Sequence, residues 1–286
     1  MYKTTLLLTA LCIGFFASAQ KTPKLLGTCS VHDLEKEPYA TWYAASYASY
    51  EPNKEITGRL KKINLKKYTI KAVFGSWCGD SKRELPRFTK LLNATAFPSE
   101  NLQLIGVNDS LQVYKQAPGH EEKDLEVYRV PTFIVYEKGQ EIGRIVEYAS
   151  LSLEQDLLTI LSAQTYTSNY FTYPLITGWL RQGVLTDPNV NVRGLAGQLK
   201  PKVGYESELN SCGYVLLMRG QVKESITVFR INVSLFPQSA NCLDSLGEAY
   251  AAAGEKEKAI QAYEGAQKID PENENVKKQL LKLKGS

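Results

Sequence analysis

Histidine and cysteine are scarce in this chain, whose 286 residues include two histidines and five cysteines. His32 and His120 stand alone, without the spacing of metal ligands, so the sequence predicts no metal site and no cofactor. Four cysteines lie beyond the N-terminal segment: Cys29, Cys78, Cys212 and Cys242. Four are too few for a fold built on disulfides, so one of them is expected to carry chemistry.

Neither sign of charge is in large excess, because the formal net charge is +4 and charged residues make up 22% of the chain. The densest basic run consists of Lys61, Lys62, Lys66 and Lys67. It lacks the aromatic residues and the glycine-rich loop that accompany nucleic-acid and phosphate sites. We interpret it as a solvated face and expect no nucleic-acid partner. Hydrophobic residues at 43% are typical of a globular chain and exclude wholesale disorder.

Long hydrophobic runs are missing apart from residues 6–16, which follow Lys3 and precede Ala17-Ser18-Ala19. A basic residue, an apolar stretch and a small-x-small motif form the pattern of a secretory signal peptide. The stretch is shorter than the roughly 20 residues that span a bilayer. We therefore expect a cleaved signal peptide at 1–19, a mature chain that begins at Gln20, and no stable membrane insertion. The protein would be exported, to the periplasm in a Gram-negative source and otherwise to the extracellular space.

Residues 20–63 are expected to form a helical N-terminal extension that packs on the following domain. Four aromatic residues recur at spacings that suit one helical face: Trp42, Tyr43, Tyr47 and Tyr50. We interpret this stripe as core, with a ligand platform as the alternative.

Residues 64–164 alternate between strand and helix patterns. The predicted strands are 68–74, 102–107, 132–136 and 141–147, and the predicted helices are 82–92, 121–128 and 153–161, the last after a Ser152 cap. This order predicts an α/β domain with a mixed central sheet flanked by helices. Residues 165–204 are interpreted as a connector with one helix near Trp179.

Residues 205–286 contain an internal repeat with a period of 34 residues. Four pairs recur at that spacing: Gly213 and Gly247, Gly220 and Gly254, Phe229 and Tyr263, and Pro237 and Pro271. Small residues allow two helices to approach closely, and an aromatic ring fills the space between neighbouring helices. The pattern resembles the tetratricopeptide family, which implies two all-α repeats followed by a capping helix at 274–283. Two repeats alone expose an apolar edge, so we expect them to dock on the connector or on the α/β domain.

A second motif lies where the strand at 68–74 passes into a helix: Trp77-Cys78-Gly79-Asp80-Ser81. Pro86 follows eight residues after Cys78, and Val130-Pro131-Thr132 opens a later strand. Together these features resemble the thioredoxin family, in which a WCxxC site precedes a proline-kinked helix. In that family a cis-proline loop, here at Pro131, faces the cysteine.

The site departs from the thioredoxin pattern at two positions. Ser81 replaces the second cysteine, which would resolve a mixed disulfide, and Ala72 replaces the buried acid that would assist that step. Cys78 itself is at a helix N-terminus, where the helix macrodipole stabilises thiolate over thiol. The resemblance therefore implies a thiol–disulfide oxidoreductase of the monothiol type.

Alternatives remain open for several of these residues. Ser81 could instead form a capping box with Glu84, and Cys78 could be an inert core cysteine. Cys29 could resolve Cys78 from a distance or stay free. Cys212 and Cys242 are expected in the repeat core, where they could form a disulfide.

We therefore predict that Cys78, Trp77, Pro131 and Ser81 form the catalytic site. Val130, Thr132 and Gly79 are predicted to bind the substrate, a protein client or a small thiol or disulfide. The repeats would hold a peptide of that client in their groove. The alternative is a redox-inactive adaptor in which both domains are recognition surfaces.

Overall fold

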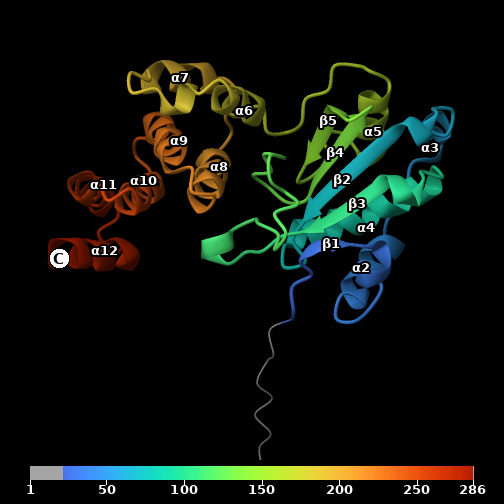
Figure 1. Cartoon of the computed structure of the whole chain (residues 1–286), viewed down its shortest axis with the longest axis horizontal. Coiled ribbons are helices and arrows are strands. Elements are labelled where there is room, and N and C mark those ends of the chain that lie inside the picture. The colour runs from blue at the N-terminus through green and yellow to red at the C-terminus, as the bar shows by residue number, and fades with distance from the viewer. Residues whose placement is uncertain (1–21, 286) are drawn as a thin grey trace, which may run out of the picture.

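The computed structural model describes residues 22–285 and divides into a sheet domain and a stack of helices (Figure 1). The predicted signal peptide at 1–19 and the predicted mature start at Gln20 lie outside the described residues. Within 22–285, no helix combines the length and apolar character needed to cross a membrane.

The sheet is mixed, as predicted, and has the strand order β1-β3-β2-β4-β5. Its strands are β1 (Gly27–Cys29), β2 (Tyr68–Phe74), β3 (Leu102–Gly106), β4 (Thr132–Glu137) and β5 (Gln140–Val146). The central strand β2 runs parallel to β3 and antiparallel to β4. The Trp77-Cys78 segment therefore follows the C-terminal end of the central strand β2.

The N-terminal extension contributes a strand as well as helices, which the purely helical prediction missed. Strand β1 pairs antiparallel with β3, with Cys29 opposite Leu104. Its helices are α1 (Val31–Leu34), α2 (Ala40–Ala48) and α3 (Lys54–Leu60), followed by the 3₁₀ turn η1 (Leu65–Lys67). The aromatic stripe packs on the domain as core, because Tyr43 is buried and its hydroxyl lies 2.8 Å from the Thr89 hydroxyl.

One face of the sheet is covered by helices of the N-terminal extension and of the α/β domain. Helices α4 (Gly79–Ala94) and α5 (Leu153–Leu161) share a hydrophobic cluster with side chains of β2, β3, β4 and β5. Phe88 of α4 stacks on Phe133 of β4 with ring centroids 4.1 Å apart. The Ser152 cap is confirmed, since its side chain accepts a hydrogen bond from the Gln155 backbone.

The opposite face is covered by a long loop between β3 and β4. The predicted helix at 121–128 is wrong: this stretch forms turns, and the loop's regular element is a 3₁₀ turn, η3 (Leu111–Val113). The reason is local, because His120, Asp124 and Glu126 have positive φ angles, which a right-handed helix does not accept. A further 3₁₀ turn, η2 (Ser99–Asn101), precedes β3.

The connector is more ordered than its composition indicates. It contains α6 (Tyr173–Arg181), η4 (Val184–Thr186) and α7 (Val192–Leu199), and α6 includes Trp179 as expected. These elements share a hydrophobic cluster with α8 (Glu206–Met218) and α9 (Val222–Leu235). The connector therefore covers the first helix pair, as the two-repeat argument anticipated.

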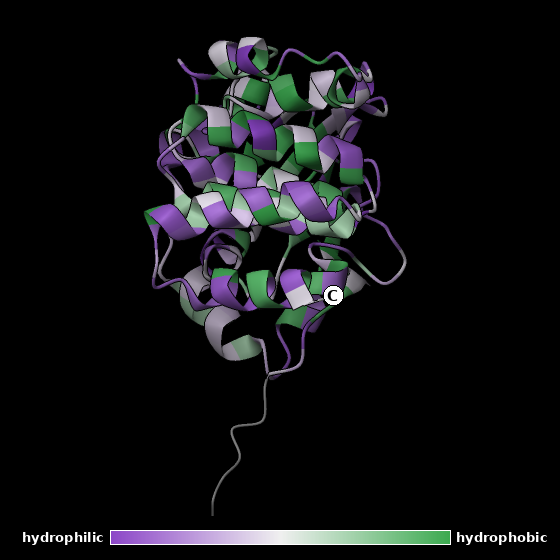
Figure 2. Ribbon diagram, turned by 90° about the vertical axis from the view of Figure 1, so that its left-hand side faces the viewer, coloured by the Kyte–Doolittle hydropathy of each residue, from purple (hydrophilic) through white to green (hydrophobic). Residues whose placement is uncertain are grey.

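The C-terminal helices form stacked antiparallel pairs consistent with tetratricopeptide repeats, and each carries hydrophobic and hydrophilic residues (Figure 2). After α8 and α9 come α10 (Ala240–Ala252), α11 (Lys256–Ile269) and the capping helix α12 (Glu274–Gly285). A Cβ added at Gly213 would lie 2.5 Å from the Phe229 ring, and one at Gly247 would lie 2.8 Å from the Tyr263 ring. The recurring glycines are thus required by close helix contact.

Candidate functional site

Cys78 is the N-cap residue of α4, directly after the β2 end of the sheet. Its side chain is half-buried against the hydrophobic cluster on the loop-covered sheet face. The Sγ atom lies 3.3 Å from the carbonyl oxygen of Val130 and donates to it as a thiol. This partly exposed sulfur is at the N-terminus of a 16-residue helix, where a reaction partner can reach it.

The loop that faces Cys78 contains a cis peptide bond between Val130 and Pro131. The structure thus brings Val130 to the predicted nucleophile. Among residues 22–285, no hydrogen bond involves the Val130 backbone N–H. An extended client segment could therefore pair with this residue as a neighbouring strand would.

Thr132 and the carbonyl of Pro131 are already engaged by the protein. Thr132 is buried, pairs with Val73 on one side and Val146 on the other, and donates its hydroxyl to the Arg129 carbonyl. The Pro131 carbonyl accepts from the Glu147 N–H at 2.7 Å. Thr132 therefore supports the loop from within the sheet.

Trp77 and Gly79 flank the cysteine in different ways. The Trp77 indole donates to the Val107 carbonyl at 2.7 Å, and its ring packs so closely on Gly75 that a Cβ there would lie 2.5 Å away. Gly79 is exposed, and no atom lies within 4 Å of a Cβ built on it. The surface around Cys78 is therefore open on the Gly79 side and fixed on the Trp77 side.

Ser81 does not form the capping box with Glu84 that we considered from sequence. The helix begins two residues earlier than Ser81, so Ser81 is in its first turn, fully buried, and accepts a hydrogen bond from the Gly75 N–H at 3.1 Å. Glu84 instead pairs with Arg83 at 2.6 Å and Arg87 at 3.4 Å. The residue at the resolving position thus holds the loop that precedes Cys78.

Ala72 lies in the hydrophobic cluster beneath α4 and is fully buried. Its neighbours across the sheet are Leu104 and Phe133, both apolar. The position that would carry a buried acid is therefore filled by core packing.

The other cysteines are not placed to assist Cys78. Cys29 packs against the cluster on the opposite, helix-covered face of the sheet, and burial raises its pKa to about 12. Cys212 is fully buried, and burial also raises its pKa. Burial raises the pKa of Cys242 to about 12. All four thiols in residues 22–285 are free, so neither considered disulfide is present there.

Sequence reasoning missed a polar link between the Pro131 loop and the helical stack. The Arg129 guanidinium donates to the Ser207 carbonyl at 3.0 Å and to its hydroxyl at 3.1 Å, and pairs with Glu147 at 3.1 Å. The Tyr170 hydroxyl bonds to the same Glu147 carboxylate. The position of Arg129 directly before Val130-Pro131 was the only signal available in the sequence.

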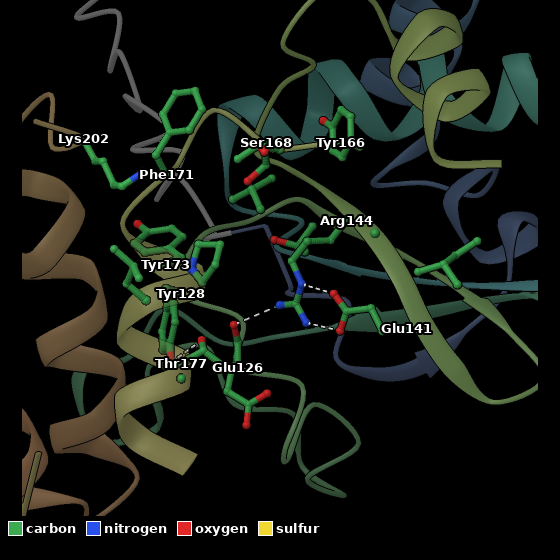
Figure 3. Close-up of a pocket in the computed structure, with 18 of the residues that line it drawn as sticks. Glu126, Tyr128, Glu141, Arg144, Tyr166, Ser168, Phe171, Tyr173, Thr177 and Lys202 are labelled. Carbon is green, nitrogen blue, oxygen red and sulfur yellow. Dashed lines mark hydrogen bonds and ion pairs between the residues drawn. The ribbon is translucent and has the colours of Figure 1, made fainter. Parts of the chain in front are cut away.

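A pocket of about 840 Å³ lies away from Cys78, between β5 and α6 (Figure 3). Tyr128, Tyr173 and Phe171 contribute aromatic walls. Two of its charged groups pair with each other: Arg144 binds both carboxylate oxygens of Glu141 at 2.6 Å, as the dashed lines show. Neither Cys78 nor another described thiol is among the residues that line this pocket.

Comparison with known proteins gives two matches. The sequence profile of the tetratricopeptide repeat matches residues 240–273. A stretch of 113 residues is 29% identical to mitochondrial thioredoxin-3 of Saccharomyces cerevisiae, a match that covers 38% of this chain and 81% of the yeast protein.

Proposed function

We propose that this chain, which joins a distant thioredoxin homologue of 113 residues to a tetratricopeptide repeat at residues 240–273, is an exported monothiol thiol–disulfide exchange protein. The observation that carries the proposal is the placement of Cys78. Its half-buried sulfur is at the N-terminus of α4 and lies 3.3 Å from the carbonyl of Val130, beside cis-Pro131.

The reaction would proceed in two exchanges that conserve electrons and sulfur bonds. The Cys78 thiolate attacks one sulfur of a client disulfide, forms a mixed disulfide, and releases the other client sulfur as a thiolate that takes a proton from water. An external thiol then loses its proton and attacks the client sulfur of the mixed disulfide, and Cys78 leaves as a thiolate. The external thiol is required because Ser81 provides no sulfur at the resolving position.

The helical stack would supply client recognition. Tetratricopeptide arrays bind extended segments of other proteins on their concave surface. A client held there would meet the sulfur of Cys78 through the Val130 backbone.

The proposal is tested with a small aromatic disulfide and the full-length protein. Wild-type Cys78 should form a mixed disulfide faster than free cysteine at mildly acidic pH, and the adduct should persist until an external thiol is added. Cys78→Ser should abolish the reaction, whereas Cys29→Ser should not. A Cys78 rate no higher than that of free cysteine across the acidic range would contradict the proposal.

A second candidate is a redox-inactive adaptor, which is favoured by the apolar packing of Ala72 and the structural hydrogen bond of Ser81. In that case client proteins bind equally well to the wild type and to Cys78→Ser, and no covalent complex forms. Covalent capture of a client by wild type alone supports the exchange reaction instead.

A further inference from the structure

A lysine is buried in the loop that covers the Cys78 face of the sheet. Lys115 has only 4% of its surface exposed. Its Nζ donates to the Tyr128 carbonyl at 2.6 Å and lies 4.4 Å from the centroid of the Tyr114 ring. Its backbone has a φ of 53°, a left-handed conformation that is unfavourable for a residue with a side chain. The chain thus places this amine inside the protein at a local cost.

The packing does not compensate that cost with an ion pair. No carboxylate in the described part of the chain forms a salt bridge with Lys115. Glu147, the acid that acts on it most strongly, is bound by Arg129 and by Tyr170. A buried amine without a carboxylate partner destabilises a fold, so its presence here points to a role outside stability.

The amine and the Cys78 thiol bind the same short segment. Lys115 donates to the carbonyl of Tyr128, and Cys78 donates to the carbonyl of Val130, two residues further along and directly before Pro131. The charged and titratable groups that act on Lys115 come from several elements: Arg129, Glu147, Cys78 and Cys212. The pKa of Lys115 is lowered to about 7, first by burial and then by the nearby Arg129 charge, while Glu147 and Cys78 act to raise it.

We propose that Lys115 acts electrostatically on Cys78: its buried ammonium group stabilises the Cys78 thiolate. The inference rests on the proposed exchange function. The position beneath α4 is the apolar Ala72, so the charge that acts on Cys78 comes from the loop on the other face of the sheet. The charge is present when the amine is protonated, below about neutral pH, and is lost as the pH rises above that range. Lys115 would therefore promote the reaction at neutral and mildly acidic pH, where a thiol without help is mostly protonated.

Formation of the mixed disulfide has a consequence for the same amine. The negative charge on Cys78 disappears when its sulfur bonds to the client, so the ammonium loses an attractive partner. The affinity of the Lys115 amine for a proton therefore falls. It returns to its former value when the external thiol releases Cys78 as a thiolate. Two groups that influence each other in this way must do so by equal amounts.

The first test measures alkylation of Cys78 by iodoacetamide in the full-length protein between pH 5.5 and 9.5, by peptide mass spectrometry. Lys115→Met should lower the rate roughly three- to tenfold at pH 6 and leave it within about twofold at pH 9, where the thiolate forms without help. Lys123→Met removes an exposed lysine of the same loop and should leave the profile unchanged. A Lys115→Met profile that matches the wild type overturns the inference.

The second test leaves Lys115 in place, so it does not depend on how well a variant folds. In protein labelled with ¹³C-lysine, the titration midpoint of the Lys115 amine is followed by NMR before and after Cys78 is capped with a neutral carbamidomethyl group. The midpoint should move to lower pH on capping, and an unchanged midpoint refutes the coupling. Slow alkylation of wild-type Cys78 would count against the exchange function itself, whereas a reactive Cys78 that is indifferent to Lys115 would count against this inference alone.

Discussion

The Ser81 hydroxyl accepts a hydrogen bond from the Gly75 N–H at 3.1 Å, so the resolving position is joined to the loop that leads to Cys78. Ser81→Cys would place a thiol there, one helical turn from the nucleophile. The mixed disulfide with an aromatic disulfide probe should then collapse into an internal disulfide between Cys78 and the introduced thiol, and release the probe thiol. Mass spectrometry and the absorbance of the released thiol measure this step.

Ser81→Ala is the matched control for that experiment. It removes the same hydroxyl but adds no sulfur, so its adduct should persist as in the wild type. Because it leaves the buried Gly75 N–H without an acceptor, it should also lower the free energy of unfolding by about 1–3 kcal/mol. Persistence of the Ser81→Cys adduct would show that the two positions cannot reach each other.

A buried acid should accelerate resolution in the Ser81→Cys background. Ala72→Asp introduces a carboxylate under α4 that can take the proton of the new thiol near neutral pH. The rate of internal disulfide formation should rise, at the expense of stability, because the site is fully buried. Ala72→Asn has a similar shape but cannot accept the proton, so an equal acceleration by both variants would exclude proton transfer as the cause.

Alkylation of the folded protein at pH 8 should be selective for Cys78. Burial raises the pKa of Cys29 and Cys242 to about 12 and raises that of Cys212 as well, so these three remain thiols at pH 8. Iodoacetamide followed by peptide mass spectrometry measures the selectivity, and denatured protein provides the control in which all four should react. Modification of Cys29 at the rate of Cys78 would contradict this picture.

The same burial predicts how stability depends on alkaline pH. A thiol whose folded pKa is raised stabilises the fold up to its unfolded pKa, near 9, and loses that contribution as the pH rises toward the folded value. The free energy of unfolding should therefore fall between pH 9 and 12, and Cys29→Ala should make the fall less steep. Chemical denaturation at a series of pH values tests this.

Tyr263→Ala should destabilise the C-terminal helices by about 3 to 5 kcal/mol, because the ring is 1% exposed and fills the space beside Gly247. Denaturant unfolding of the full chain measures the loss. Tyr205→Ala, which removes a tyrosine ring that is 76% exposed, should change the stability by less than about 0.5 kcal/mol. Equal effects of the two substitutions would argue against the repeat packing.

Processing at the N-terminus is tested by the intact mass of protein recovered from a secreting host. The pattern Ala17-Ser18-Ala19 predicts that the mature chain begins at Gln20. Recovered protein that retains Met1 would argue against a cleaved signal peptide.

The elements with a strong hydrophobic period could be predicted from sequence almost to the residue. Strand 68–74 and helix 153–161 have the predicted bounds, and the 34-residue repeat located the contacts at Phe229 and Tyr263. The segment at 121–128 could not be predicted in this way, because its conformation depends on left-handed residues that have no periodic signature. In the candidate site, Cys78 and Pro131 could be predicted because they stand in a recognisable motif.

Lys115, by contrast, is isolated in the sequence. A lysine is normally exposed, and its burial here depends on contacts made by Tyr114 and the Tyr128 carbonyl in the folded loop. The same holds for Arg129, whose partner Ser207 is 78 residues away along the chain. Contacts of this kind are determined by tertiary packing and leave no pattern along the chain.

The bond between Arg129 and Ser207 joins the Pro131 loop directly to the first turn of α8. The thiol and the repeats are thus spaced by packed structure, in contrast to domains on a flexible tether. A client bound to the repeats would present its sulfur to Cys78 at a high effective concentration only when the two client sites are separated by a matching length of chain. The fixed spacing of the two sites would then select a client disulfide by its distance along the client chain from the segment that binds the repeats.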